Sequence, residues 1–177
     1  WRLILSNDEQ KSLKQIIEYR IKKLNQLISD GINPYPYKFE KTHLISNALD
    51  SENDLNETVI ILAGRIISLR SMGKASFMNI QDETEKIQLY IKNELIGIDN
   101  YDKIVKNLDI GDIIGVEGIL FRTKTNQLSL KVSSVTLLSK SIRPLPNIKE
   151  KDGQMFFSFD DKENRYRYRH LDLIVNP

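Results

Sequence analysis

Two neighbouring segments of this chain, residues 74–81 and 86–92, alternate polar and apolar residues with a period of two. No other feature of the sequence restricts its fold as strongly. A period of two is typical of β-strands, in which successive side chains point to opposite faces of the sheet. Only a short polar stretch, Asp82-Glu83-Thr84-Glu85, separates the two segments. We therefore predict two strands joined by a turn, with one face buried.

The two faces of this predicted pair differ in chemistry. One face is apolar and suits a core: Met78, Ile80, Ile87, Leu89 and Ile91. The other carries aromatic, amide and basic side chains: Phe77, Asn79, Gln81, Lys86, Gln88, Tyr90 and Lys92. Such a face suits single-stranded nucleic acid, because rings stack on bases, amides read base edges and lysines meet phosphates. The pattern leaves a second interpretation open, in which Phe77 is a cross-strand packing partner of Tyr90.

The segments around this pair predict a mainly β fold with flanking helices. A strand at about 58–69 precedes it, and a helix begins near Asp99. Strands then follow at about 112–122 and from Gln127 onward, with Leu128, Leu130 and Val132 pointing inward. Gly115 and Gly118 inside the fourth strand predict a bulge or a sharp bend. Three strands, a helix and two strands are the order of a five-stranded OB-fold Greek-key barrel, which binds oligonucleotides on strands 2–3 and at loops L12 and L45.

The nucleic-acid face and the two loops of this predicted barrel coincide with basic and amide residues. The L12 loop would be residues 70–74 and the L45 loop residues 122–127. The candidates for base contacts are Arg70, Phe77, Gln88 and Gln127. For the two glutamines an ordinary solvated strand position is the alternative, and Arg70 could hold a phosphate or a base or, like most exposed arginines, neither. The predicted phosphate contacts are Lys74, Lys86 and Lys92 on the barrel, and Lys11 and Lys14 on a preceding helix, for which an ordinary solvated face is the alternative.

That preceding helix is predicted over residues 8–30. Ser6 and Glu9 have the spacing of a capping box, and Gly31 is a natural stop. Its apolar residues recur at helical spacing and form one stripe: Leu13, Ile16, Ile17, Ile21, Leu24, Leu27 and Ile28. A short helix is also predicted within residues 46–55. The chain thus divides into a helix and connecting loop (1–57), the barrel (58–140) and a C-terminal segment (141–177).

The C-terminal segment is predicted to contain a stiff linker, Arg143-Pro144-Leu145-Pro146, and a helix from Asp160 or Asp161 to Ile174. The alternation of basic and aromatic residues at 165–170 is compatible with nucleic-acid binding, but packing and ion pairs explain it equally well. The segment looks like the beginning of another domain.

Composition excludes several other classes of function. The chain has 177 residues, no cysteine and two histidines, so disulfides and thiolate zinc sites are excluded and a histidine metal cluster is improbable. Asp109 and Asp112 lie near each other without a further set of metal or acid–base residues. No apolar run approaches a membrane span, and we expect a cytoplasmic protein without a metal site. The net charge is only +2, so binding electrostatics must come from placement.

Several segments, taken in order, resemble the N-terminal part of bacterial class II lysyl-tRNA synthetases. They are Gly31-Ile32-Asn33-Pro34-Tyr35-Pro36, Ala63-Gly64-Arg65-Ile66, Arg70-Ser71-Met72-Gly73-Lys74-Ala75-Ser76-Phe77, Lys86-Ile87-Gln88-Leu89-Tyr90, Leu108-Asp109-Ile110-Gly111-Asp112, Arg143-Pro144-Leu145-Pro146 and residues 165–174. The resemblance implies an anticodon-binding OB-fold in which Phe77 stacks on an anticodon base, while Arg70 and Gln88 hydrogen-bond the uridine-rich lysine anticodon. The family usually has a glutamate at the position of Gln127.

The resemblance also implies the properties of a longer enzyme. That enzyme attaches lysine to tRNA(Lys) with ATP and Mg²⁺, as a homodimer, and its class II catalytic motifs lie beyond residue 177. We therefore expect no cofactor and no activity in this chain alone. The alternatives are an aspartyl- or asparaginyl-type synthetase with the same barrel, and a free-standing OB-fold module that binds single-stranded nucleic acid.

Overall fold

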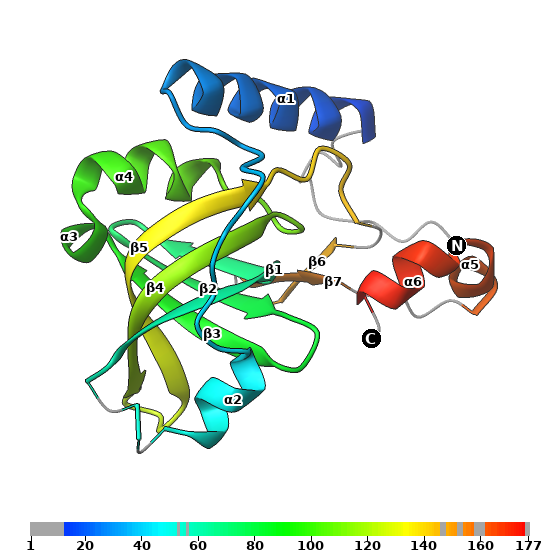
Figure 1. The fold of residues 1–177 in the computed structure, drawn as a ribbon. Helices are drawn as coiled ribbons and strands as arrows, with labels where there is room; N and C mark the ends of the chain where they lie inside the picture. The colour runs from blue at the N-terminus through cyan, green and yellow to red at the C-terminus, as the bar shows by residue number, and fades with distance from the viewer. Residues whose placement is uncertain are drawn as a thin grey trace.

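The computed structural model describes residues 13–52, 54–55, 57–145, 148–151, 154–157 and 162–175. Its centre is a barrel of five strands: β1 (Val59–Met72), β2 (Ala75–Gln81), β3 (Lys86–Lys92), β4 (Ile113–Arg122) and β5 (Leu128–Ser139). The strands pair in the order β1-β2-β3-β5-β4, and β4 returns to β1, which closes the barrel (Figure 1). The β3–β5 pairing is parallel and the others are antiparallel. The predicted OB-fold is confirmed.

Alternating residues of the strands fill the inside of this barrel. The five side chains predicted to point inward from β2 and β3 are each no more than 2% exposed. Their outward neighbours are half-buried or exposed, as the burial patterns of the two strands show. The period of two in the sequence therefore corresponds to one buried face and one partly open face.

Two glycines of β4 lie where another part of the chain approaches the strand closely. A Cβ atom on Gly118 would lie 2.3 Å from the carbonyl oxygen of Lys131, and the β4–β5 register shifts between Glu117 and Gly118. A Cβ atom on Gly115 would lie 2.2 Å from the ring of Phe39. The predicted irregularity is thus a β-bulge at a close strand approach.

The connection between β3 and β4 is not the single helix that the sequence predicted. It consists of α3 (Asn93–Ile96), α4 (Ile98–Lys103) and a 3₁₀ turn, η1 (Val105–Asn107). The prediction that Asp99 caps the helix was wrong: the N-cap of α4 is Gly97, with a φ of 87° and no side-chain cap. Asp99 instead lies in the first turn and pairs with Lys103 at 2.8 Å.

The short helix α2 (Ile45–Asp50) receives its N-terminal cap from elsewhere in the chain. In the β2–β3 turn, Asp82 Oδ2 accepts from the amide of Ile45 at 2.9 Å, and Thr84 Oγ1 accepts from the amide of Ser46 at 3.2 Å. Burial alone would raise the pKa of Asp82, but hydrogen bonds from Thr84, Ile45 and Glu85 hold it below its usual value. The β2–β3 turn therefore holds α2 against the barrel.

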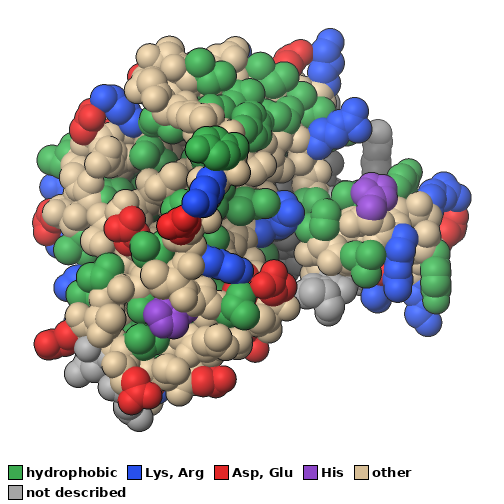
Figure 2. Space-filling view, in the orientation of Figure 1, with side chains coloured by type: hydrophobic (Ala, Val, Ile, Leu, Met, Phe, Trp, Pro, Cys, Tyr) green, Lys and Arg blue, Asp and Glu red, His purple; other side chains and the backbone are tan. Residues whose placement is uncertain are grey.

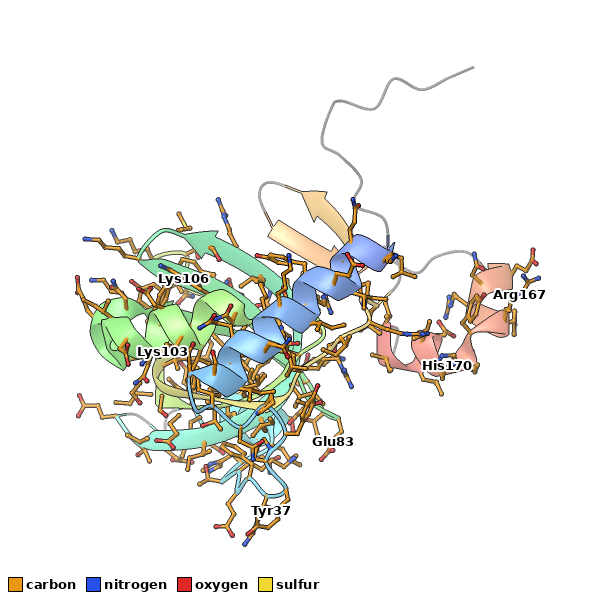
Figure 3. The ribbon with its side chains drawn as sticks, turned by 90° about the horizontal axis from the view of Figure 1, so that it is seen from above. Tyr37, Glu83, Lys103, Lys106, Arg167 and His170 are labelled. Carbon is orange, nitrogen blue, oxygen red and sulfur yellow. The ribbon has the colours of Figure 1, made fainter. Side chains whose placement is uncertain are left out.

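Helix α1 (Leu13–Ser29) lies across one end of the barrel (Figures 1 and 3). The start of the predicted helix, its capping box and Lys11 fall outside the described residues. Only Leu27 of the predicted apolar stripe is fully buried, whereas Leu13, Ile21 and Ile28 are 60%, 40% and 55% exposed. Polar contacts attach the helix instead. Buried Arg20 donates to the carbonyl oxygens of Ser141 and Ile110 at 2.8 and 3.0 Å.

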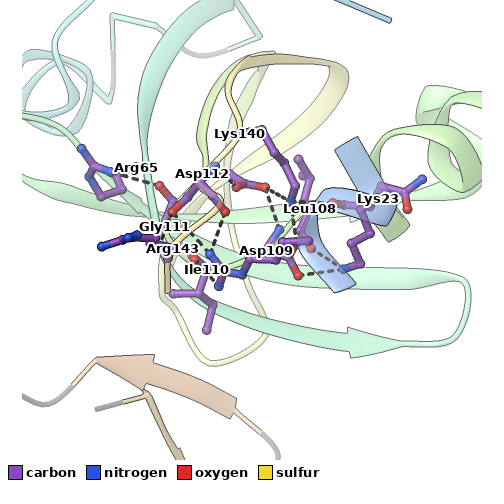
Figure 4. A network of polar contacts seen from close by, with 12 residues as sticks. Lys23, Arg65, Leu108, Asp109, Ile110, Gly111, Asp112, Lys140 and Arg143 are labelled. Carbon is purple, nitrogen blue, oxygen red and sulfur yellow. Dashed lines mark hydrogen bonds and ion pairs between the residues drawn. The ribbon is translucent and has the colours of Figure 1, made fainter. Parts of the chain in front are cut away.

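A buried polar network continues from this contact (Figure 4). The ammonium group of Lys140 donates to Asp109, to Asp112 at 2.7 Å and to the carbonyl oxygen of Asn107 at 2.9 Å. Lys23 of α1 reaches Asp109 at 2.7 Å. Asp109 and Asp112, the neighbouring aspartates noted in the sequence, thus pair with lysines. These pairs hold α1, the end of β5 and the segment before β4 together.

The C-terminal segment contains elements that the sequence did not predict. The hairpin of β6 (Ile148–Lys151) and β7 (Gln154–Phe157) adds to the edge of β1 at Ser68 and Leu69. The predicted final helix is two helices, α5 (Lys162–Arg167) and α6 (Arg169–Val175), separated at Tyr168. Arg165 and Arg169 both bond to Asp172, at 2.6 and 2.8 Å, which favours the ion-pair interpretation of residues 165–170.

No helix in the described ranges combines the length and the apolar character that a bilayer crossing requires. In the same part of the chain, no three His, Cys, Asp or Glu side chains are grouped so that they could hold a metal ion.

Candidate nucleic-acid interface

A groove of about 360 Å³ opens on the outer surface of the barrel, between the strands β1–β3 and the β4–β5 hairpin. All four residues predicted to contact bases line it: Arg70, Phe77, Gln88 and Gln127. They come from β1, β2, β3 and the β4–β5 hairpin, and the barrel brings them together. Lys124 and Thr125 of the hairpin form part of the same wall.

Strand register explains why these side chains meet. Phe77 of β2 lies opposite Arg70 of β1 and opposite Tyr90 of β3. Two residues along β2, Asn79 lies opposite both Ser68 and Gln88. Side chains two apart on one strand share a face, so the groove floor consists of two cross-strand rows.

The Phe77 ring packs against Tyr90, with ring centroids 5.1 Å apart and planes tilted by 38°. Tyr90 in turn contacts Phe121 of β4 at 6.0 Å. Phe77 thus makes the cross-strand contact and also lines the groove. The two interpretations left open by the sequence are therefore compatible, since Tyr90 and Phe121 support a ring that a base can approach from the groove.

Two amide side chains on the groove floor are held by serine hydroxyls. The hydroxyl of Ser129, which is itself buried, donates to Gln88 Oε1 at 3.0 Å. Asn79 Nδ2 donates to Ser68 Oγ at 2.8 Å. Asn79 and Ser68 also line the groove, although the sequence analysis did not select them as site residues. The signal for Asn79 in the sequence was the alternation of β2, which placed it on the same face as Phe77.

The β4–β5 hairpin that carries Gln127 is tightly closed by its own hydrogen bonds. The amide of Thr123 donates to the carbonyl oxygen of Gln127 at 3.0 Å, and the amide of Asn126 donates to Thr123 at 2.9 Å. The Thr123 hydroxyl accepts from the amide of Gln127 at 3.1 Å. Asn126 has a φ of 63°, in the left-handed region that asparagine tolerates best after glycine. These bonds fix the shape of the hairpin and the position of Gln127 within it.

The four predicted phosphate contacts that the structure describes, Lys14, Lys74, Lys86 and Lys92, do not line this groove. Lys74 and Lys86 are exposed on the barrel surface. Lys92 bonds to Glu94, which raises the pKa of Lys92. Lys14 is exposed on α1, 4.0 Å from Glu18. Among the groove residues, Arg70 and Lys124 supply the positive charge, while acidic and basic side chains are interspersed on the face that Figure 2 shows.

Comparison with known proteins agrees with the barrel fold described above. Residues 60–138, which cover most of the barrel, match the tRNA anticodon family described as an OB-fold nucleic acid binding domain. The match includes β2, β3 and the β4–β5 hairpin, and so includes the whole groove.

The chain is also similar over nearly its full length to curated lysine–tRNA ligases. It is 43% identical over 169 residues to that of Carboxydothermus hydrogenoformans, covering 96% of this chain and 33% of the relative. It is 43% identical over 175 residues to that of Thermoanaerobacter pseudethanolicus, covering 98% and 33%. It is 40% identical over 176 residues to that of Halalkalibacterium halodurans, covering 96% of this chain and 34% of the relative. The chain spans about a third of the length of these relatives.

Proposed function

We propose that this chain, an anticodon-binding OB-fold domain that matches the N-terminal region of lysine–tRNA ligases, binds the anticodon of tRNA(Lys) in the groove on β1–β3. The observation that carries the proposal is the meeting of Arg70, Phe77, Gln88 and Gln127 in one groove. These side chains supply the stacking surface, the cation and the amides that single-stranded RNA recognition requires.

Each groove residue has a distinct part in this proposal. Phe77 stacks on an anticodon base, a contact worth roughly 1–3 kcal/mol. Arg70 donates to a base or a phosphate. Because Ser129 holds the oxygen of Gln88, the amide nitrogen of Gln88 is the group available to donate to a uracil carbonyl. Gln127 offers both a donor and an acceptor, where a glutamate would offer only acceptors and a charge.

We extend the proposal to the longer protein of which such a chain forms part. Its relatives are lysine–tRNA ligases, and we infer that it attaches lysine to tRNA(Lys) with ATP and Mg²⁺, in the cytoplasm and as a homodimer. The barrel would hold the anticodon while the acceptor end reaches a catalytic domain in the two thirds of the relatives that this chain does not cover. The chain alone should then bind RNA without catalysing ligation.

Replacement of Phe77 by alanine tests the proposed groove. We expect binding of a synthetic anticodon stem-loop with a UUU anticodon to weaken about tenfold, since one stacking contact is lost. Affinity is measured by titration of the labelled RNA at fixed salt. Tyr37→Ala is the matched control, because Tyr37 is fully exposed and points away from the barrel (Figure 3). Unchanged affinity in a folded Phe77→Ala variant would refute the stacking role.

A second measurement distinguishes base readout from general binding of single strands. The wild-type chain is titrated with stem-loops that carry UUU and GUC anticodons. We expect clear preference for UUU, because amide side chains that line the groove can hydrogen-bond base edges. Equal affinity for the two loops would leave only a module that binds single strands without regard to sequence.

A further inference from the structure

A bidentate ion pair connects the β4–β5 hairpin to the rest of the chain through Arg122, a residue that does not line the groove. Arg122 ends β4 and begins the β4–β5 hairpin. Its Nε donates to Glu52 Oε1 at 2.7 Å, and its Nη2 donates to Glu52 Oε2, so the pair is bidentate. Its Nη1 donates to the carbonyl oxygen of Asn126 at 2.9 Å. One guanidinium group thus joins both ends of the hairpin to the segment after α2.

This geometry leaves Arg122 poorly suited to bind phosphate directly. The sequence placed it in a basic L45 loop, but three of its donors are occupied within the chain. The Glu52 side chain is 29% exposed and that of Arg122 is 48% exposed. Exposed ion pairs usually contribute little, but a bidentate pair that also bonds a carbonyl group fixes the direction of both side chains.

The hairpin that this contact holds is the part of the groove wall that carries Gln127. Asn126, whose carbonyl oxygen accepts from Arg122, directly precedes Gln127. The carbonyl oxygen of Gln127 also lies 3.4 Å from the hydroxyl of Ser129, which holds Gln88. Any movement of the hairpin would therefore displace Gln127 relative to the amide on the groove floor.

We propose that Glu52 and Arg122 are positioning residues, which fix the β4–β5 hairpin so that Gln127 stands in the groove before RNA arrives. This inference rests on the proposed function and adds to it two residues outside the groove. The physical effect is preorganisation: a wall that is ordered in the free protein does not have to be ordered on binding. Ordering one side chain costs about 0.5–1.5 kcal/mol, which corresponds to about two- to tenfold in affinity.

The sign of the change in RNA affinity separates this role from simple electrostatics. Glu52→Gln removes a negative charge close to a site for a polyanion, so charge alone predicts tighter binding. Arg122→Lys keeps the charge but loses the bidentate geometry, so charge alone predicts no change. The positioning role predicts that both substitutions weaken binding of the UUU stem-loop, by about two- to tenfold. Glu40→Gln is the control, because Glu40 is an exposed partner of Lys38 in a different loop.

The test combines RNA titration of the full 177-residue chain with amide hydrogen exchange. In both variants we expect faster exchange at Asn126 and Gln127, with unchanged exchange in β2 and β3. Gln127→Ala should weaken binding by itself, and combining it with Glu52→Gln should weaken binding no further, because both act through the same side chain. Additive losses, tighter or unchanged binding of Glu52→Gln, or unchanged exchange of the hairpin would each overturn the proposal.

Failure of this inference is distinguishable from failure of the proposed function. If the wild-type chain binds neither stem-loop, the proposed function is wrong and the role in RNA binding is wrong with it. If the wild type binds UUU selectively and the variants bind as tightly, anticodon binding stands and only the positioning role is overturned.

Discussion

Substitution of Lys140 by methionine would test how the polar network at the end of the barrel contributes to stability. The Lys140 side chain is 0% exposed, and its ammonium group donates to Asp109, Asp112 and the carbonyl oxygen of Asn107. Methionine has a similar length and no charge, so the substitution removes the cation without opening a large cavity. It leaves the Asp112 carboxylate, also 0% exposed, without its ammonium partner.

The expected cost is large because a buried charge loses its counter-ion. Removing one partner of a buried ion pair typically costs about 3–5 kcal/mol. For a chain of this size, 1 kcal/mol shifts the melting temperature by about 2–4 °C, so we expect Tm to fall by about 6–20 °C. A loss of this size is a large share of a typical total stability of about 5–15 kcal/mol.

The pH dependence provides a second, independent signature. Burial alone would raise the pKa of Asp109, but Lys140 and Lys23 hold that pKa below its usual value. A carboxyl with a lowered folded-state pKa stabilises the protein above its unfolded pKa of about 3.9, and that contribution is lost as the pH falls through the folded pKa. In folded Lys140→Met we expect the pKa of Asp109 to be higher than in the wild type, because Lys140 no longer lowers it. Protonation of Asp109 at acid pH then removes part of the loss of stability. The difference in stability should be largest near neutral pH and should shrink below about pH 5.

Urea denaturation of both proteins at several pH values measures these differences. Lys106→Met is the matched control, since Lys106 forms an exposed pair with Asp102 and should cost no more than about 0.5 kcal/mol. A cost for Lys140→Met as small as that of the control would refute the reasoning. So would a large cost that does not change between neutral and acid pH, because a cost of that kind would come from packing.

Two further substitutions test the capping contact and the strand bulge. Asp82→Ala removes the acceptor for the amide of Ile45 and should cost about 1 kcal/mol in urea denaturation. Hydrogen bonds lower the pKa of Asp82 by more than burial raises it, so the carboxylate stabilises the fold above about pH 4 and this contribution fades at lower pH. A cost of Asp82→Ala that is the same at acid and neutral pH would contradict this reasoning. Gly118→Ala would place a Cβ atom 2.3 Å from the carbonyl oxygen of Lys131, and should cost about 1–3 kcal/mol. Wild-type stability in that variant would show that β4 and β5 can separate there.

The barrel was predictable because its information is local. A strand with one buried face must alternate, and β2 and β3 do so without exception. Helix α1 shows where local information ends. Its apolar stripe was correctly recognised, but the helix is attached through Arg20, whose partner Ser141 is 121 positions away. Periodicity cannot reveal that a charged residue will be buried, because the burial depends on carbonyl groups that only the folded chain supplies.

The part of the groove that lies on β2 and β3 was predictable, because residues of these strands alternate between the buried and the outer face. Arg70, Phe77, Gln88 and Gln127 were selected from the strand pattern, the loop positions and a family resemblance, and the structure places all four in one groove. Their contacts with RNA stay a prediction. The link between Glu52 and Arg122 had no sequence signal, since the two residues are 70 positions apart and each resembles an ordinary surface charge.

The proposed selection of one RNA sequence has to be reconciled with the small net charge of this chain. With a net charge of +2, attraction by the net charge is weak, so affinity must come from the placement of individual contacts and charges. The groove side chains are already held in the free protein: Phe77 by Tyr90, Gln88 by Ser129 and Asn79 by Ser68. A held side chain loses little entropy when it binds, and it also cannot adapt to a base of the wrong shape. For the proposed function, order in the free groove would therefore serve affinity and selectivity together, and contacts outside the groove that maintain this order would belong to the recognition site.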